Sequence, residues 1–154
     1  MTLTIRPATR DDLAAVIALY ESSGIDAPGA NDLAAARGHW AQMQRAGAQV
    51  LLAEHEGRAV GTLTLFILPL LGHALAPQAL VEDVAVDPAA QGQGVGRALM
   101  NHAMGVARGR GCYKLALTSN VKRERAHGFY DSLGFTRHGI SFVVPLDDRQ
   151  EARP

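Results

Sequence analysis

Residues Val81–Met104 read VEDVAVDPAAQGQGVGRALMNHAM, and the rest of the chain is organised around them. Val81–Val86 predicts a buried strand, Pro88 lies in a short turn, and the glycine-rich loop Gln91–Gly96 leads into a helix that begins near Gly94. Glycines let the backbone approach a ligand closely, and the N–H groups at a helix start attract anions. The stretch therefore predicts a binding site for a phosphorylated small molecule, although a plain glycine-rich turn would carry the same residues.

Three phosphate-binding patterns can be compared with this loop. The P-loop requires a lysine followed by serine or threonine after the last glycine, and no lysine follows here. The dinucleotide fingerprint GxGxxG has a different spacing from Gly92-x-Gly94-x-Gly96. The third pattern, Q/R-x-x-G-x-G/A, is met by Gln91, Gly94 and Gly96.

This third pattern resembles the pyrophosphate-binding motif of the GNAT superfamily of acyl-CoA-dependent N-acetyltransferases. Three further segments resemble the family's opening, its fourth strand, and its last helix and turn. They are Ile5-Arg6-Pro7-Ala8-Thr9-x-x-Asp12, Val81-Glu82-Asp83-Val84-Ala85-Val86-x-Pro88 and Phe129-Tyr130-x-x-x-Gly134-Phe135. Together the segments span residues 5–135, nearly the whole chain.

Composition limits the class of protein. The 154 residues are 47% hydrophobic with a formal net charge of +0, which predicts one domain over residues 1–154 with 147–154 as a loose tail. Without a basic excess we expect no nucleic-acid partner. The single cysteine, Cys112, excludes an internal disulfide, and the scattered histidines predict no metal site. We find no signal peptide at the N-terminus, and the apolar run Ala59–Leu71 is too short for a bilayer, so we expect a cytoplasmic protein without a membrane partner.

The remaining chain predicts alternating elements. We expect strands at 2–6, 49–53, 58–67, 81–86 and 114–118, and a last hairpin from 135–137 and 140–146. Helical spacing predicts helices after Thr9, after Asn31, from Gly94 to the glycines near Arg110, and over 125–133. The order predicts an α/β fold of the GNAT type: a mixed, mostly antiparallel sheet with a central parallel βαβ crossover and helices on both faces.

The resemblance implies acetyl-CoA as the acyl donor. Its pyrophosphate would be held by the loop and first helical turn, namely Gln91, Gly92, Gln93, Gly94, Val95, Gly96 and Arg97. Its pantetheine arm would pair with the backbone of Val84, Ala85 and Val86. Asn120 either contacts this arm or caps the following helix.

The resemblance also implies catalytic roles. Glu82 matches a position where several members carry a general base, and burial would raise the pKa of its carboxyl group. Asp83, expected on the opposite face of the strand, or a water molecule could serve instead, and Glu82 could simply bind the acceptor's cation. Tyr130 matches the general-acid position, where its hydroxyl would protonate the thiolate leaving group; a core tyrosine would show the same helical spacing.

The expected acceptor is a primary amine of a small molecule, such as an amino sugar. Two alternatives stay open: acetylation of protein N-termini or lysines, and a regulatory module that binds acyl-CoA without turnover. The edge of the last hairpin, Ile140–Val144, could also pair in a homodimer.

Overall fold

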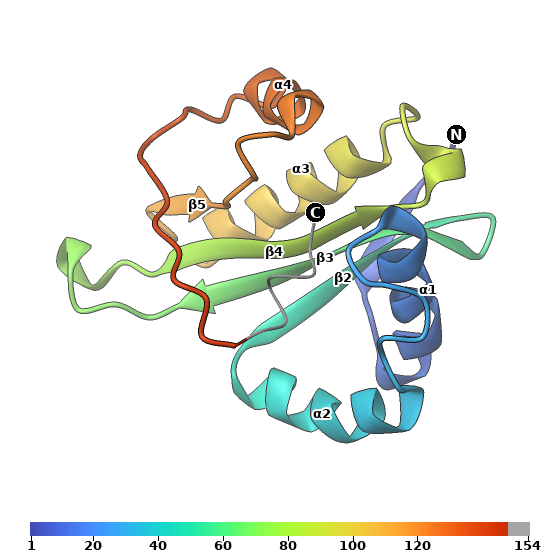
Figure 1. The fold of residues 1–154 in the computed structure, drawn as a ribbon. Coiled ribbons are helices and arrows are strands. Elements are labelled where there is room, and N and C mark those ends of the chain that lie inside the picture. The colour runs from blue at the N-terminus through green and yellow to red at the C-terminus, as the bar shows by residue number, and fades with distance from the viewer. Residues whose placement is uncertain (148–154) are drawn as a thin grey trace. The chain divides into compact units, whose positions relative to one another are not determined.

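The computed structural model describes residues 1–147, and the chain divides into two compact units, Met1–Leu117 and Thr118–Pro154. The first unit holds a five-stranded sheet in the order β1-β2-β3-β4-β5 (Figure 1). The strands are β1 (Thr4–Pro7), β2 (Ala48–His55), β3 (Arg58–Leu68), β4 (Gln78–Val86) and β5 (Lys114–Ala116). Its helices are α1 (Leu13–Ser23), α2 (Leu33–Arg45) and α3 (Val95–Gly109), with short 3-10 turns η1 (Arg10–Asp12), η2 (His73–Leu75) and η3 (Pro88–Ala90).

Strand directions confirm the predicted sheet. The first four strands pair antiparallel with their neighbours, whereas β4 and β5 pair in parallel. Helix α3 makes the crossover between the two parallel strands, as the run of residues after Val86 predicts. The mixed, mostly antiparallel α/β sheet is therefore confirmed.

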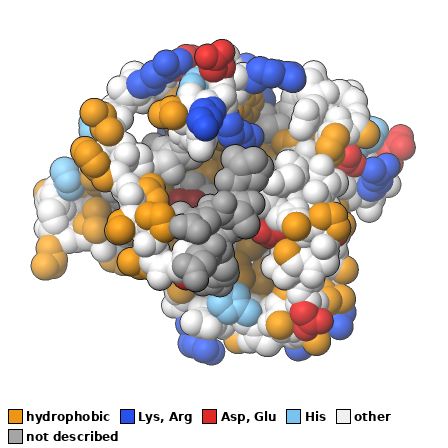
Figure 2. All heavy atoms as spheres, viewed as in Figure 1, with side chains coloured by type: hydrophobic (Ala, Val, Ile, Leu, Met, Phe, Trp, Pro, Cys, Tyr) orange, Lys and Arg blue, Asp and Glu red, His pale blue; other side chains and the backbone are white. Residues whose placement is uncertain are grey.

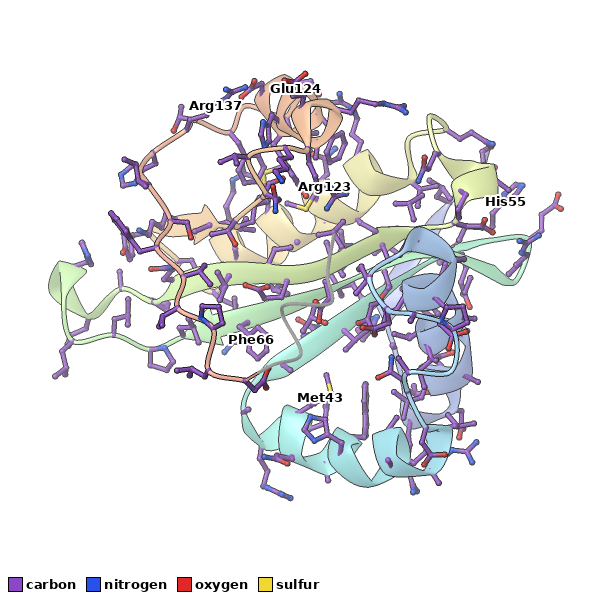
Figure 3. The ribbon with its side chains drawn as sticks, in the orientation of Figure 1. Met43, His55, Phe66, Arg123, Glu124 and Arg137 are labelled. Carbon is purple, nitrogen blue, oxygen red and sulfur yellow. The ribbon has the colours of Figure 1, made fainter. Side chains whose placement is uncertain are left out.

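Helices cover both faces of this sheet (Figure 1). Val50 and Leu52 of β2 are buried against Val16 and Leu19 of α1, in a cluster that also contacts α2. Met43 of α2 points toward the sheet (Figure 3). The alternate residues of β2 and β3 face α3, whose inward side is formed by Val95, Leu99, Met100, Ala103 and Ala107.

The first hairpin shows how local chemistry sets register. β2 and β3 are joined at Glu56 and Gly57, whose φ angles are 50° and 74°. Two successive positive φ values match the right-handed twist of paired strands, which is why glycine is favoured at such turns. The strands expected at 49–53 and 58–67 are therefore present and form a hairpin.

The second unit contains helix α4 (Glu124–Ser132), which ends before Gly134 at φ 87°. The predicted helix is confirmed, but the predicted last hairpin is wrong, since residues 135–146 form no strand within the described range. Phe142 is 90% exposed there. Strand propensity alone does not make a strand, because a strand needs a hydrogen-bonding partner. The expected loose tail lies largely outside the described residues, and the single domain stays a prediction.

Within residues 1–147, no helix is both long enough and apolar enough to cross a membrane.

Candidate active site

The glycine loop follows β4 through a tightly bonded turn. Asp87 donates its backbone N–H to the carbonyl of Val60 (2.9 Å), and its side chain accepts from the N–H of Ala89 (3.0 Å). Pro88 begins η3, where its missing N–H is no loss. These bonds hold the exit of β4 against β3, so the loop that comes next starts from a fixed position.

The loop itself depends on two left-handed glycines. Gly92 has φ 75°, and Gly94, the N-cap of α3, has φ 85°. A Cβ added at either glycine would meet no protein atom within 4 Å. Packing therefore does not demand glycine here; the backbone conformation does, and the space above the loop is open to a ligand.

The start of α3 offers hydrogen-bond donors to that space. Val95, Gly96 and Arg97 occupy its first turn, where backbone N–H groups have no acceptor inside the helix. No acidic residue lies in this turn, so the helix dipole is left for an anionic ligand. The loop and helix start thus have the hydrogen-bond donors, the positive electrostatic potential and the open space that a pyrophosphate needs.

Just before this loop, β4 carries a β-bulge. Thr64 of β3 pairs with Glu82, but Thr62 pairs with Ala85. Leu63 alone therefore lies opposite both Asp83 and Val84, and Asp83 takes the left-handed φ of 51°. Such strain in a non-glycine residue is concentrated at functional sites.

The bulge begins directly after Glu82, at Asp83, the residue expected on the opposite face of the strand. Glu82 shares the α1 face with its partner Thr64, and the carboxylate of Asp83 acts on both Glu82 and Tyr20 of α1. Strict alternation ends at the extra residue, because a bulge turns its side chain off the regular pleat. Glu82 therefore lies on the α1 side and feels the charge of Asp83.

Electrostatics at the bulge favour a proton acceptor. The pKa of Glu82 is raised, first by burial and then by the negative charge of Asp83. A raised carboxyl pKa moves the group toward the range that a general base needs near neutral pH. Sequence reasoning missed Thr64, the 3% exposed hydroxyl residue opposite Glu82. Only the register of the bulge reveals it.

The predicted residues Tyr130 and Asn120 belong to the second unit. Tyr130 lies on α4, between the rings of Phe129 (centroids 5.1 Å apart) and Phe135 (5.7 Å). Burial raises its pKa, and the positive charge of Arg123 lowers it. A raised pKa keeps the hydroxyl protonated, as a general acid requires. Figure 3 shows Arg123 and Glu124 at the start of this helix.

Asn120 does not cap α4, so that alternative is wrong. The N-cap is Arg123, and Asn120 instead accepts from the N–H of Lys122 (2.9 Å) through its side chain. Its carbonyl lies 2.8 Å from Nε2 of His127. β5 ends at Ala116, so Asn120 lies in the turn beyond the strand rather than at its end.

In the first unit, the glycine loop, Val84–Val86 and Glu82 all lie along the end of β4. Tyr130 and Asn120 share the other unit. Among the described residues, no group of three His, Cys, Asp or Glu side chains is placed to hold a metal ion.

Comparison with solved structures supports this architecture. The chain superposes on a putative acetyltransferase from Agrobacterium tumefaciens str. C58 with a TM-score of 0.85 at 31% identity, covering 92% of this chain and 99% of that one. It is also similar to an acetyltransferase from Trypanosoma brucei, with a TM-score of 0.84 at 28% identity, covering 94% of this chain and all of the other.

Sequence comparison agrees. The chain is 37% identical over 90 residues to the glucosamine 6-phosphate N-acetyltransferase of Trypanosoma brucei brucei, covering 58% of this chain and 59% of that protein. The chain thus spans about three fifths of the length of this curated relative. Residues 13–135 match the sequence profile described as Acetyltransferase (GNAT) family. A match over most of the length, on this fold, assigns the protein: the chain belongs to the GNAT acetyltransferase family.

Proposed function

We propose that this protein transfers the acetyl group of acetyl-CoA to the primary amine of a small molecule, with amino sugars as the first class to test. The proposal rests on two features that follow each other at the end of β4. The first is the bulge beside Glu82, whose carboxyl pKa is raised, and the second is the open start of α3, whose N–H groups can bind an anion. The carboxylate can deprotonate an amine, and the helix start can bind a pyrophosphate. The relatives named for glucosamine 6-phosphate and aminoglycosides support the substrate class.

In this proposal the donor is bound by backbone groups. Gln91–Arg97 hold the pyrophosphate, and the exposed charge of Arg97 adds to the dipole of α3. The edge of β4 at Val84, Ala85 and Val86 pairs with the pantetheine arm, helped by Asn120. The thioester supplies an activated acetyl group, and the protein's task is to place an uncharged amine beside it.

Two side chains then move protons. Glu82 takes the proton of the attacking ammonium group, directly or through water, so that the nitrogen lone pair can form the C–N bond. The C–S bond breaks as the tetrahedral centre collapses, and Tyr130 gives its proton to the departing sulfur. The nitrogen, which still carries one extra proton after the attack, loses it to the Tyr130 oxygen or to water, leaving the neutral amide and the free thiol of CoA. A backbone N–H near Val84 donates to the oxyanion between these steps.

Calorimetric titration of acetyl-CoA tests the donor site with a matched pair of variants. Asn and Asp both tolerate positive φ, so Gly94→Asn and Gly94→Asp place similar side chains on the loop, and only the second adds a negative charge. We expect Gly94→Asp to bind at least about tenfold more weakly than Gly94→Asn because of repulsion from the pyrophosphate. No binding by folded wild type would refute the donor site.

Amine-dependent release of CoA tests the acceptor class. Glucosamine 6-phosphate, an aminoglycoside, free lysine and a peptide with an N-terminal alanine form the screen. Preference for the sugars supports the proposal, preference for the peptide favours protein acetylation, and donor binding without turnover on any amine favours a regulatory module.

We also propose that the protein forms a homodimer and is located in the cytoplasm. Ile140, Phe142 and Val144 are 82%, 90% and 74% exposed, which favours their burial in a homodimer. Light scattering of wild type and of Phe142→Ser tests this pairing, and cell fractionation tests a cytoplasmic location.

A further inference from the structure

Asp87 is the last carboxylate before the glycine loop. The sequence has no aspartate or glutamate from residue 88 to residue 123, so no other acidic side chain follows it in the loop or in α3. Its side chain is only 15% exposed. A negative charge that is largely withdrawn from water acts over a longer range, and next to a pyrophosphate site it would repel the ligand.

Hydrogen bonds connect this carboxylate to the loop itself. Oδ1 of Asp87 accepts from the N–H of Ala89 in η3 at 3.0 Å. The carbonyl of Ala89 in turn accepts from Nε2 of Gln93, in the middle of the loop, at 3.0 Å. Two hydrogen bonds and one residue therefore separate the carboxylate from the side chain of Gln93. This short connection holds the loop, but it also keeps a negative charge close to the open space above Gly92 and Gly94.

Arg58, the first residue of β3, supplies the opposite charge. Its Nη2 donates to Oδ2 of Asp87 at 2.6 Å, so one oxygen of the carboxylate binds η3 and the other binds the guanidinium. Figure 2 shows basic and acidic side chains next to one another where the β2–β3 hairpin reaches the surface. Because the side chain of Arg58 is 73% exposed, the pair adds little to the stability of the fold. Its effect is therefore to be sought at the neighbouring loop.

We propose that Arg58 sets the affinity of the donor site: by neutralising Asp87, it keeps the carboxylate that holds the glycine loop from repelling the pyrophosphate of acetyl-CoA. The inference rests on the proposed function, since it takes the donor to be acetyl-CoA bound at Gln91–Arg97. Arg58 acts through Asp87 and needs no contact with the donor. The bond to Ala89 requires only an oxygen, which an asparagine would also offer, so charge and loop geometry can be separated by substitution.

A double-mutant cycle at Arg58 and Asp87 tests this role by calorimetric titration of acetyl-CoA at low salt. We expect Arg58→Gln to weaken binding about five- to tenfold, because it leaves Asp87 unpaired, and Arg58→Lys to stay within about twofold of wild type. Asp87→Asn removes the charge and should bind about as tightly as wild type. In the double variant Arg58→Gln/Asp87→Asn, which has no carboxylate to neutralise, affinity should return to that of Asp87→Asn. Arg45→Gln removes the same charge at an exposed position of α2 and is the matched control.

Salt provides a second readout that a purely structural role would not change. The loop is open to solvent, so dissolved ions can screen the repulsion between Asp87 and the pyrophosphate. The ratio of the dissociation constants of Arg58→Gln and wild type should therefore fall at least about twofold between about 0.02 M and about 0.5 M salt. Circular dichroism of each variant verifies that the fold is retained.

Several results would overturn the inference. Equal binding by wild type and Arg58→Gln would remove the role of Arg58. A loss that persists in the double variant, or that does not change with salt, would mean that Arg58 acts on the shape of the loop and not through charge. An equal loss in Arg45→Gln would assign the effect to net charge. If wild type itself does not bind acetyl-CoA, the proposed function fails and this inference fails with it, whereas the other results refute the inference alone.

Discussion

Glu82 and Ala85 lie on the same face of β4 although they are three positions apart, because they pair with Thr64 and Thr62 of β3. In a regular strand, residues three positions apart point to opposite faces. The bulge between them therefore lets Ala85 be buried beneath α1 while Glu82 stays accessible on the same side. This one irregularity therefore sets both the position of the proposed base, Glu82, and the burial of Ala85.

Substitutions at Asp83 should reveal the strain of the bulge. Left-handed backbone costs an L-residue about 1–2 kcal/mol, less for Asp, and glycine avoids it. We expect Asp83→Gly to raise the free energy of unfolding by about 0.5 kcal/mol and Asp83→Ala to lower it by about 1 kcal/mol. Urea unfolding of the three proteins measures both. A more stable Asp83→Ala would mean that the bulge relaxes at no cost.

Glu82→Gln should remove the proposed general base without changing side-chain size. We expect kcat/KM for the amine to fall about 100-fold or more, while the affinity for acetyl-CoA stays the same. Glu56→Gln, at an exposed position in the β2–β3 turn, is the matched control and should retain wild-type turnover. Full activity of Glu82→Gln would transfer the role to Asp83 or to water.

The pH dependence of the same reaction follows from the charges around Glu82. Its pKa is raised by burial and by Asp83, so activity should decline, as pH falls, at a higher pH than for an ordinary carboxyl group. Asp83→Asn removes the repelling charge and should move this acidic limb to lower pH. A limb that stays in place would show that another group controls it.

Tyr130→Phe tests the proposed general acid, which lies in the second unit. Because the pKa of Tyr130 is raised by burial, the hydroxyl is protonated at neutral pH and can donate to sulfur. We expect kcat to fall about 100-fold with little change in acetyl-CoA affinity. Tyr113→Phe, a partly exposed tyrosine elsewhere, provides the control. Equal small losses in both variants would remove Tyr130 from the mechanism.

Much of this organisation could be predicted from the residues themselves. The strand, glycine loop and helix of Val81–Met104 predict a βαβ crossover, because each of the three segments has its own local sequence pattern. The bulge could not be predicted, since Asp83 in a run of strand-forming residues carries no mark of positive φ. The cap of α2 shows the same limit on a smaller scale. Asp32 accepts from Ala35, while the expected cap, Asn31, donates to Asp26.

The prediction of the last hairpin was wrong for a different reason. Ile140–Leu146 has the composition of a strand, but pairing depends on residues distant in sequence or in another chain. Likewise, the position of Thr64 opposite Glu82 depends on the register of β3, which the printed residues do not reveal. Local chemistry therefore predicted the elements, and long-range register decided which side chains meet.

The Arg6 network should make stability depend on acidity. Arg6 contacts Asp12 (2.8 Å) and Glu54 (2.7 Å), joining β1, η1 and β2. The hydrogen bond from Arg6 is the main reason that the pKa of Asp12 lies well below its usual range. A depressed carboxyl pKa stabilises the fold above the unfolded value, about pH 4, and this contribution is lost as pH falls toward the folded value.

Comparison of wild type with Asp12→Asn measures that contribution. The pair is partly exposed to solvent, so we expect a loss of only about 1 kcal/mol in the free energy of unfolding at pH 7. The difference between the two proteins should shrink when urea unfolding is repeated below about pH 4. A difference that stays constant with pH would show that the charge of Asp12 is not the source of the stabilisation.

Gly61→Ala tests how closely α3 must approach the sheet. An added Cβ would lie 2.6 Å from Cγ1 of Val95 and 3.3 Å from the carbonyl oxygen of Ala85, so helix or strand must shift. Overpacking of this kind costs about 1–3 kcal/mol. Gly105→Ala, in the same helix with no atom within 4 Å of the new Cβ, should instead stabilise the fold by about 0.5–1 kcal/mol.

The same pair of variants connects packing to ligand binding. Val95 is the first residue of α3, directly after the glycine loop, and Ala85 lies on the β4 edge proposed for the pantetheine arm. A shift forced at Gly61 therefore reaches both proposed donor contacts at once, and acetyl-CoA affinity should fall in Gly61→Ala but not in Gly105→Ala. Calorimetry on the two folded variants decides the matter. If Gly61→Ala loses stability yet binds acetyl-CoA as wild type does, the strain is absorbed elsewhere, and the loop does not depend on the packing of α3.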